Sequence, residues 1–427
     1  MELREQKRLP ATRLAAAGVF FWGSIIGLFL LCHMTRDVVA RLATQPGAGF
    51  RFYLPSLKGM VFLTSVGVLV HPIVTDTRRI FATARKSIIC NTLAVSAGIA
   101  VLLAFLVFHP GNDSMGDRYA EKSLAPFEQD TGWYNKRLLM PAMAHILFFR
   151  GNWLYYVFSN LIFLLFLSVL YSWLRNHTGV KPWHFLSLST CSFVIFQYQF
   201  PGYPDALVYT FFVLVMIPAF TQKSKLCFLL LALVAHETSL FMGSILACRY
   251  LNLGYRLRFL TALILYGVIW VTAYDFNIRS VFENHHAGGM SGIDWVFLAP
   301  RAELLGVFIA FKAIWLLLIL AIILALRYQS YTDALFIAGC VGVGMLMTFL
   351  GVDTSRHMGV AFPGVLVALE TIRYHMPRQA ASRTLSSIFA ANLLIPSFYI
   401  GLNTGIVLRP GLYKHLYFIL FSIKDTI

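Results

Sequence analysis

The sequence consists largely of apolar runs of about twenty residues, a length that as a helix crosses the roughly 30 Å hydrocarbon core of a bilayer. No water in that core binds backbone polar groups, so such runs must be helical. The 427 residues are 58% hydrophobic and 13% charged, far from the balance of a soluble globular domain. We therefore predict an all-α fold, a polytopic transmembrane bundle of about 11–13 helices, some short or broken.

The first apolar run follows a basic N-terminal segment, and no convincing cleavage site comes after it. We therefore predict that this run is an uncleaved first helix and that the N-terminus is cytoplasmic. The last run is short. The predicted spans cover residues 14–32, 60–74, 88–108, 153–174, 184–200, 206–220, 259–274, 304–326, 334–350, 358–372, 385–402 and 416–423.

The net charge of +16 comes from lysines and arginines in the short connectors between apolar runs. Positive connectors stay on the cytoplasmic side of a membrane, so this pattern indicates topology and leaves no basic, aromatic surface for nucleic acid. We predict a multi-pass protein of the bacterial inner membrane. With a cytoplasmic N-terminus, the basic connectors all fall on one side, at residues 78–86, 175–181, 223–225, 327 and 373–383.

The run 226–248 is long enough to cross once, yet basic residues flank both of its ends. A single crossing would place one basic flank outside. We predict instead two half-length helices that meet at the polar turn 236–238 and return to the cytoplasmic side. Such broken helices occur where the exposed backbone lines a cavity or packs against protein.

The longest connector, 109–151, falls on the outer side and is the most acidic. Its apolar part, 138–149, is too short to span, so it lies in the interface or re-enters from outside. We divide the chain into an N-terminal two-helix extension (1–87), a membrane core that includes this loop (88–372) and C-terminal membrane helices (373–427).

Four short polar segments interrupt the apolar chain, and the predicted topology places all of them on the outer side. Ionisable groups at membrane depth are costly, so several on one face indicate a functional site. We call these segments the four polar islands. They contain Glu128, Asp130 and Arg137; Tyr203, Pro204 and Asp205; His236 and Glu237; and Asp353, Thr354, Ser355, Arg356 and His357.

Each island also has a structural interpretation that the sequence leaves open. Glu128 and Asp130 suit an ordinary solvated loop, and Asp205 suits a helix cap. Glu237 suits a structural ion pair, and 353–357 suits a soluble connector. Lys312, inside the run 304–326, is expected to extend its ammonium group to the membrane surface.

Three motifs resemble the GT-C superfamily of integral membrane glycosyltransferases, in which a long outer loop with an acidic motif such as ExD follows a transmembrane helix. The Glu128-Gln129-Asp130 segment occupies such a loop, and 130–141 is similar to a "D…YY..RLLLP" pattern of bacterial relatives. The segments 203–207 and 235–238 are similar to two further motifs of these relatives. The ExD here follows the third predicted helix, so the chain has two additional N-terminal helices.

The resemblance implies transfer of a sugar from a polyprenyl-phosphate carrier to a glycan, lipid or protein acceptor at the outer face. A carboxylate accepts the acceptor proton in such chemistry, and we assign Asp130 this role, with Glu128 assisting. Both are also candidate ligands for a divalent cation, Mg²⁺ or Mn²⁺. The remaining candidates bind substrate: Trp133 and Tyr134 the sugar face, Arg137, His236 and Arg356 the phosphate, and Asp205, Glu237, Asp353 and His357 the sugar or these cations.

Two other functions explain the same residues. A transporter or flippase of a lipid-linked or anionic substrate places ionisable groups at a broken helix. A polymerase of lipid-linked polysaccharide units uses phosphate-binding arginines on the same face and needs no ExD motif.

Overall fold

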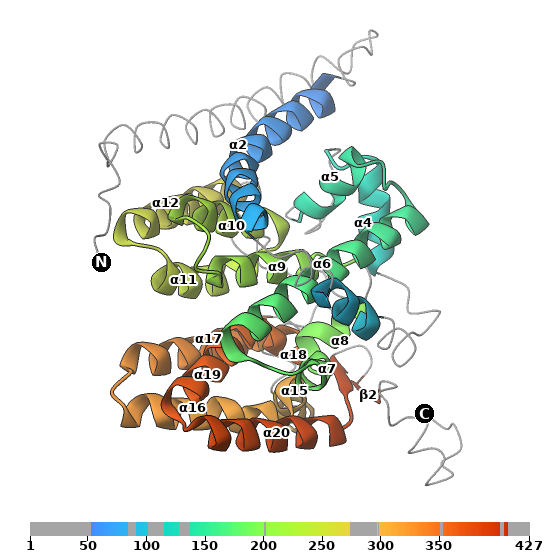
Figure 1. The fold of residues 1–427 in the computed structure, drawn as a ribbon. Helices are drawn as coiled ribbons and strands as arrows, with labels where there is room; N and C mark the ends of the chain where they lie inside the picture. Colours follow the sequence, from blue (N-terminus) through green and yellow to red (C-terminus); the bar gives the residue numbers. More distant parts are fainter. Residues whose placement is uncertain are drawn as a thin grey trace, which may run out of the picture.

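The computed structural model of the chain describes residues 53–83, 91–100, 115–127, 137–199, 202–273, 297, 299–350, 353–401 and 405–408. Helices form most of this part of the chain, as predicted, and one short β-hairpin accompanies them. Two helix groups lie on either side of α6 and α9 (Figure 1). One group contains α2, α10, α11 and α12, and the other contains α16, α17, α19 and α20. The predicted runs 14–32 and 416–423 lie outside the described residues.

The helices have the following bounds: α2 Tyr53–Thr83, α4 Met115–Leu124, α5 Leu139–Ile146, α6 Asn152–Thr178, α7 Pro182–Ser189, α8 Ser192–Gln199, α9 Asp205–Met216, α10 Gln222–Ala235, α11 Ser239–Tyr250, α12 Leu253–Ala273, α15 Pro300–Phe311, α16 Ile314–Arg327, α17 Tyr331–Leu350, α18 Thr354–Met358, α19 Phe362–His375 and α20 Arg378–Leu394. A 3₁₀ turn, η3 Gly359–Ala361, joins α18 to α19. Residues 91–100 also form an apolar helix, inside the predicted run 88–108.

Two helices of the described chain are long and apolar enough to cross a membrane, α6 from Trp153 and α17. The number rises to three if α15 and α16 form one bent span. The predicted runs 153–174 and 334–350 are therefore continuous helices. The run 206–220 is not long enough to span, because its helix, α9, has only 12 residues.

Two of the predicted spans are each divided into two helices, at positions that the sequence analysis did not identify. The run 184–200 divides into α7 and α8 at Thr190 and Cys191, and the run 304–326 divides into α15 and α16 with a bend of 75°. At the second break Lys312 has φ 51° and ψ −124°, a backbone conformation that residues with a Cβ rarely adopt. No proline or glycine stands at either break, so local sequence gives no sign of them.

Lys312 is buried rather than extended to the surface, which corrects the prediction made for it. Its ammonium group donates to Thr190 Oγ1 at 2.7 Å, to Ile395 O at 3.1 Å and to Ser397 Oγ at 3.2 Å. These three acceptors satisfy the three donors of the ammonium group. The side chain therefore fastens the α15–α16 break to the α7–α8 break and to the segment after α20.

The run 385–402 was predicted to be one helix, and this prediction was also wrong. Helix α20 ends at Leu394, and Ile395 is extended because the following residue, Pro396, disfavours helical backbone before it. The chain then forms the strands β1 Phe398–Gly401 and β2 Gly405–Leu408, an antiparallel pair with Phe398 opposite Leu408.

Helices α10 and α11 are the two predicted half-length helices, and they form a hairpin with its tip at residues 236–238. The two far ends meet, since Gln222 Nε2 at the start of α10 donates to Tyr250 O at the end of α11 at 3.2 Å. Gln222 Oε1 also accepts from the Asn252 amide at 2.9 Å. Helix α2 anchors this base, where Asp76 accepts from the Thr221 amide at 2.8 Å.

The basic connectors of the described chain gather at the end of the molecule that holds this hairpin base. Arg249 at the end of α11 pairs with Asp333 at the start of α17 at 2.6 Å. Ser330, between α16 and α17, lies 3.2 Å from His375 at the end of α19. The hairpin tip, the start of α9 and α18 lie at the other ends of these helices. In the described part of the chain, these connectors therefore lie away from the second, third and fourth polar islands, and the membrane side of each stays a prediction.

An aromatic cluster underlies the start of α19 and connects the central helices. The Phe362 ring lies 5.0 Å from Tyr209 of α9, 5.1 Å from Phe193 of α8 and 6.1 Å from Phe166 of α6, measured between ring centres. Aromatic pairs at these distances stabilise the fold by more than the burial of their apolar surface alone. The cluster holds the elements that carry the second and fourth polar islands at fixed positions.

Candidate functional site

Arg137 and Glu237 join the first polar island to the third. Arg137 Nε donates to Glu237 Oε2 at 2.9 Å, and Arg137 Nη2 donates to Glu237 Oε1. This is the bidentate geometry of a strong charge-assisted pair. Arg137 lies two residues before the start of α5, whereas Glu237 lies in the tip of the α10–α11 hairpin. The α5 segment, predicted to be interfacial, is half-buried, with Leu139, Met140 and Ala142 in the interior.

Arg356 and Asp205 join the fourth polar island to the second. Arg356 Nε and Nη2 donate to Asp205 Oδ2 at 2.8 and 2.6 Å, and Nη1 donates to Asp353 Oδ2 at 3.3 Å. Asp205 is the first residue of α9 and makes no capping hydrogen bond, so the capping interpretation does not apply. The guanidinium group lies over the Tyr203 ring, 4.3 Å from its centre, which adds a cation–π contact.

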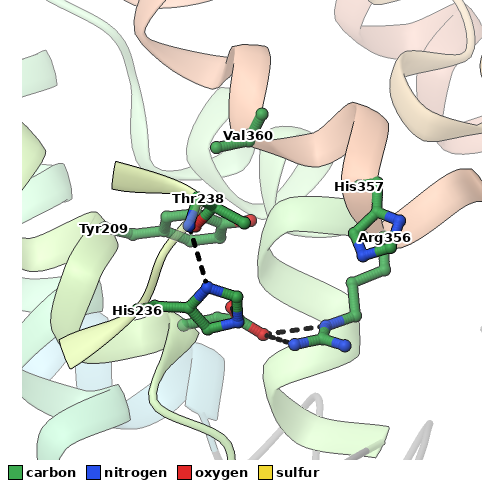
Figure 2. A pocket seen from close by; sticks show the side chains of 7 residues that line it. Tyr209, His236, Thr238, Arg356, His357 and Val360 are labelled. Atoms are coloured by element: carbon green, nitrogen blue, oxygen red, sulfur yellow. Dashed lines mark hydrogen bonds and ion pairs between the residues drawn. The ribbon is translucent and has the colours of Figure 1, made fainter. Parts of the chain in front are cut away.

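His236 lies between the two ion pairs. Its Nδ1 accepts a hydrogen bond from the Thr238 amide at 3.1 Å, so Nδ1 carries no proton and Nε2 carries one in the neutral ring (Figure 2). Nε2 points toward Asp205 Oδ1 at 3.6 Å, beyond hydrogen-bond distance, and has no other partner in the described residues. His236 therefore presents a neutral, unsatisfied N–H donor beside a carboxylate.

Tyr119 is a site residue that the sequence did not indicate. It lies in α4, is fully buried, and its hydroxyl accepts from Arg137 Nη1 at 2.8 Å. Its ring meets the Tyr203 ring edge-on at 5.6 Å. Tyr119 binds Arg137 by a hydrogen bond, and the Tyr203 ring contacts Arg356. Because the two rings are in contact, they connect the two arginines. Tyr119 is one of several tyrosines in the chain, and only its tertiary neighbours distinguish it.

A small cavity, about large enough for one water molecule and partly open to solvent, lies where the second, third and fourth islands meet. Figure 2 shows Arg356 from α18 and His236 from the hairpin tip directed toward the same space. A space of this size is far smaller than pockets that enclose a ligand, and in this structure it admits a water molecule or a single polar group. The lining residues are Asp205, Tyr209, His236, Thr238, Arg356, His357 and Val360.

The turn before α9 sets the position of Asp205. Gly202 has φ 96°, a conformation that glycine adopts without strain, and its missing side chain leaves room for the Gly116 backbone. The Gly202 amide donates to Ser159 Oγ at 2.8 Å, and Tyr155 donates its hydroxyl to Gly202 O at 2.8 Å. Both partners belong to α6, so this long helix fixes the turn.

The described residues of the site do not carry the net positive charge that is expected of a simple anion-binding site. Burial raises the pKa of Asp205, but the Arg356 cation outweighs it and holds that pKa below the ordinary value. Burial lowers the pKa of His357 to about 4, so its ring is neutral at pH 7. Among the described residues of the site, three carboxyl groups, those of Asp205, Glu237 and Asp353, pair with two arginines, so carboxyl groups exceed guanidinium groups by one. A phosphate must therefore compete with these carboxylates, whereas substrate hydroxyls can donate to them directly.

The described structure brings three complete islands and Arg137 of the first together. It does not include Glu128, Asp130, Trp133 or Tyr134, which lie outside the described residues. The predicted metal ligands Glu128 and Asp130 therefore stay predictions. Within the described ranges, no group of three or more His, Cys, Asp or Glu side chains is arranged to hold a metal ion.

These observations define an α-helical protein with helices long and apolar enough to span a membrane, a hairpin of two short helices and a buried cluster of ion pairs at the hairpin tip. No family model matches the chain, and comparisons with curated proteins and with solved structures likewise found no match. The glycosyltransferase resemblance of the motifs accordingly enters below as a proposal.

Proposed function

We propose that the protein is a multi-pass membrane glycosyltransferase that moves a sugar from a polyprenyl-phosphate carrier to a glycan, lipid or protein acceptor. The observation that carries this proposal is the convergence of polar groups from α5, α9, the hairpin tip and α18 at one site. These groups are distant in sequence, and a solvated loop or a single structural ion pair does not require them to meet. Their meeting favours a site over four separate local roles.

A location in the bacterial inner membrane is part of the proposal. Helices α12 and α16 expose continuous apolar stripes, and each stripe repeats at helical spacing. Lipid is the environment that such faces suit, because soluble proteins rarely expose apolar patches of this size. The stripes are formed by Leu257, Leu260, Ile264 and Val268 on α12, and by Leu316, Ile319, Ile323 and Leu326 on α16.

In the proposed reaction the acceptor oxygen bonds to the anomeric carbon, and the bond from that carbon to the carrier phosphate breaks. The phosphate leaves with the bonding electrons, and Asp130 takes the acceptor proton, with Glu128 assisting or binding a divalent cation. Asp205, His236 and Glu237 offer partners for sugar hydroxyls beside the cavity. Of the three hydrogen bonds of the Arg356 guanidinium group, the one from Nη1 to Asp353 is the longest, at 3.3 Å. We therefore expect a substrate phosphate to replace Asp353 as the acceptor of this hydrogen bond most readily.

The test is transfer from polyprenyl-phosphate sugars to candidate acceptors by purified protein in lipid nanodiscs. We expect Asp130→Asn, Glu237→Gln and Arg356→Lys to lose at least about 100-fold in turnover, the lower range for removal of an acid–base or charge-stabilising group. Asp333→Asn is the matched control, because it breaks the Arg249–Asp333 ion pair at the opposite end of the molecule. If the three site variants transfer sugar as fast as this control, the proposal is wrong.

A transporter or flippase is the second candidate, and the broken helices favour it. The hairpin tip reaches the cavity, and α15 and α16 bend by 75° at Lys312, as in transporters whose discontinuous helices form the substrate site. Reconstituted liposomes distinguish the two functions. Movement of a lipid-linked substrate across the bilayer that Asp130→Asn leaves intact, without any sugar transfer, would support the second candidate.

A further inference from the structure

Glu303 is a buried carboxyl group that the proposed reaction does not use. It lies in the first turn of α15, and only 6% of its surface is exposed. Thr354 donates its hydroxyl to Glu303 Oε2. Thr354 is the first residue of α18, the short helix that also carries Arg356. Glu303 is therefore one hydrogen bond away from the helix that forms the candidate site.

The second oxygen of this carboxyl group, Oε1, is buried and has no hydrogen-bond partner in the described structure. Thr348 of α17 places its hydroxyl beside the same carboxyl group while donating to Met345 O at 2.7 Å. Glu303 is thus surrounded by neutral hydroxyl oxygens. Its surroundings differ from those of Asp205 and Glu237, which each face an arginine.

No described cation neutralises Glu303. Arg301 on its own helix is exposed, and Lys312 at the far end of α15 is saturated by three neutral acceptors. On α18, Arg356 is held by Asp205 and Asp353. The remaining titratable groups of α18, Asp353 and His357, are an acid and a neutral imidazole.

An isolated carboxylate in such a place is costly, so the group takes up a proton or binds a cation. The N-terminus of α15 stabilises a nearby negative charge only slightly, and this effect is small beside the cost of removing a carboxylate from water. A compact, singly charged ion fits this environment. It would meet the Glu303 carboxylate oxygens and the hydroxyl oxygens of Thr348 and Thr354.

We propose that Glu303, with the hydroxyl groups of Thr348 and Thr354, is a binding site for a monovalent cation, either a proton or Na⁺. A proton would bind to Oε1, the oxygen without a partner. Na⁺ would bind between the carboxylate and the two hydroxyl groups. In both cases occupancy changes the charge next to Thr354, and therefore the environment of the helix that presents Arg356 to the cavity.

The experiment measures thermal unfolding of the purified full chain in nanodiscs, with Na⁺ or choline⁺ at equal ionic strength and over a range of pH. Infrared difference spectra between wild type and Glu303→Gln report the protonated carboxyl band. Glutamine keeps an acceptor for Thr354 but has no charge. Glu303→Met is the second variant, should the amide impair folding. Glu370→Gln, a half-buried glutamate of α19 near His177, is the matched control.

Two results support the site and separate the two ions. Two observations together assign a proton. Glu303→Gln removes a protonated-carboxyl band, and the melting temperature falls with rising pH in wild type and in Glu370→Gln but not in the Glu303 variants. Na⁺ is assigned if it raises the melting temperature relative to choline⁺ in wild type and in Glu370→Gln but not in the Glu303 variants. The inference is overturned if the Glu303 variants and wild type respond identically to pH and Na⁺ and no carboxyl band is lost. None of these results depends on sugar transfer.

Discussion

Replacing Asp205 by asparagine tests the central ion pair. The substitution keeps the shape of the side chain and removes its charge, so the two shortest hydrogen bonds of Arg356, 2.8 and 2.6 Å, lose their ionised acceptor. Only 7% of the Asp205 side chain and 10% of the Arg356 side chain are exposed, so water cannot replace the lost partner. Removing one member of a buried pair costs about 3–5 kcal/mol, and we expect a loss in this range.

The matched comparison is Glu237→Gln, because 29% of the Glu237 side chain is exposed and solvent compensates part of its loss. We expect its cost to be smaller than that of Asp205→Asn. The free energy of unfolding is followed by tryptophan fluorescence as the SDS fraction of mixed micelles rises. Asp205→Asn combined with Arg356→Gln should destabilise by less than the sum of the single changes, by about 0.5–3 kcal/mol.

Additive effects would refute the reasoning, since they would mean that the two side chains do not interact across the fold. An Asp205→Asn cost equal to or below that of Glu237→Gln would also refute it. Burial would then not control the strength of these pairs.

Two further predictions concern the turn before α9 and the helix α18. Gly202→Ala should destabilise by about 1–3 kcal/mol, because φ is 96° and the new Cβ would lie 2.8 Å from Gly116 Cα; Gly267→Ala, in open space on α12, should be neutral or slightly stabilising in the same unfolding assay. His357 has a pKa lowered to about 4 by burial, so unfolding takes up a proton and stability should fall as pH drops from about 6.5 toward 4. His357→Gln should flatten that part of the pH profile relative to wild type, and an unchanged profile would contradict the assignment.

The division of residues 226–248 into the two helices of a hairpin was predictable because its signal is local. Basic residues flank both ends of one apolar run, and the polar residues 236–238 divide it into equal halves, so charge placement alone favours a return. The breaks at Thr190–Cys191 and at Lys312 were not predictable. Their stabilising contact, from the Lys312 ammonium group to Thr190, joins residues 122 positions apart.

The end of α20 could be predicted from the sequence only in part. Pro396 marks a helix boundary in the sequence, yet the apolar composition on both sides suggested that the run continued. The hairpin after it depends on pairing between β1 and β2, which apolar composition does not reveal. Composition predicts burial here, and it does not distinguish a buried helix from a short buried strand.

Hydropathy and charge, which act residue by residue along the chain, were sufficient to predict the helical class, the hairpin and most members of the candidate site. The pairing of the charges became known from the three-dimensional arrangement of the helices. That arrangement placed Arg137 against Glu237 and Arg356 against Asp205, added Tyr119, and left Glu303 without a cation in the described residues. Pairing depends on distances between helices that are remote in sequence, and composition and spacing do not encode those distances.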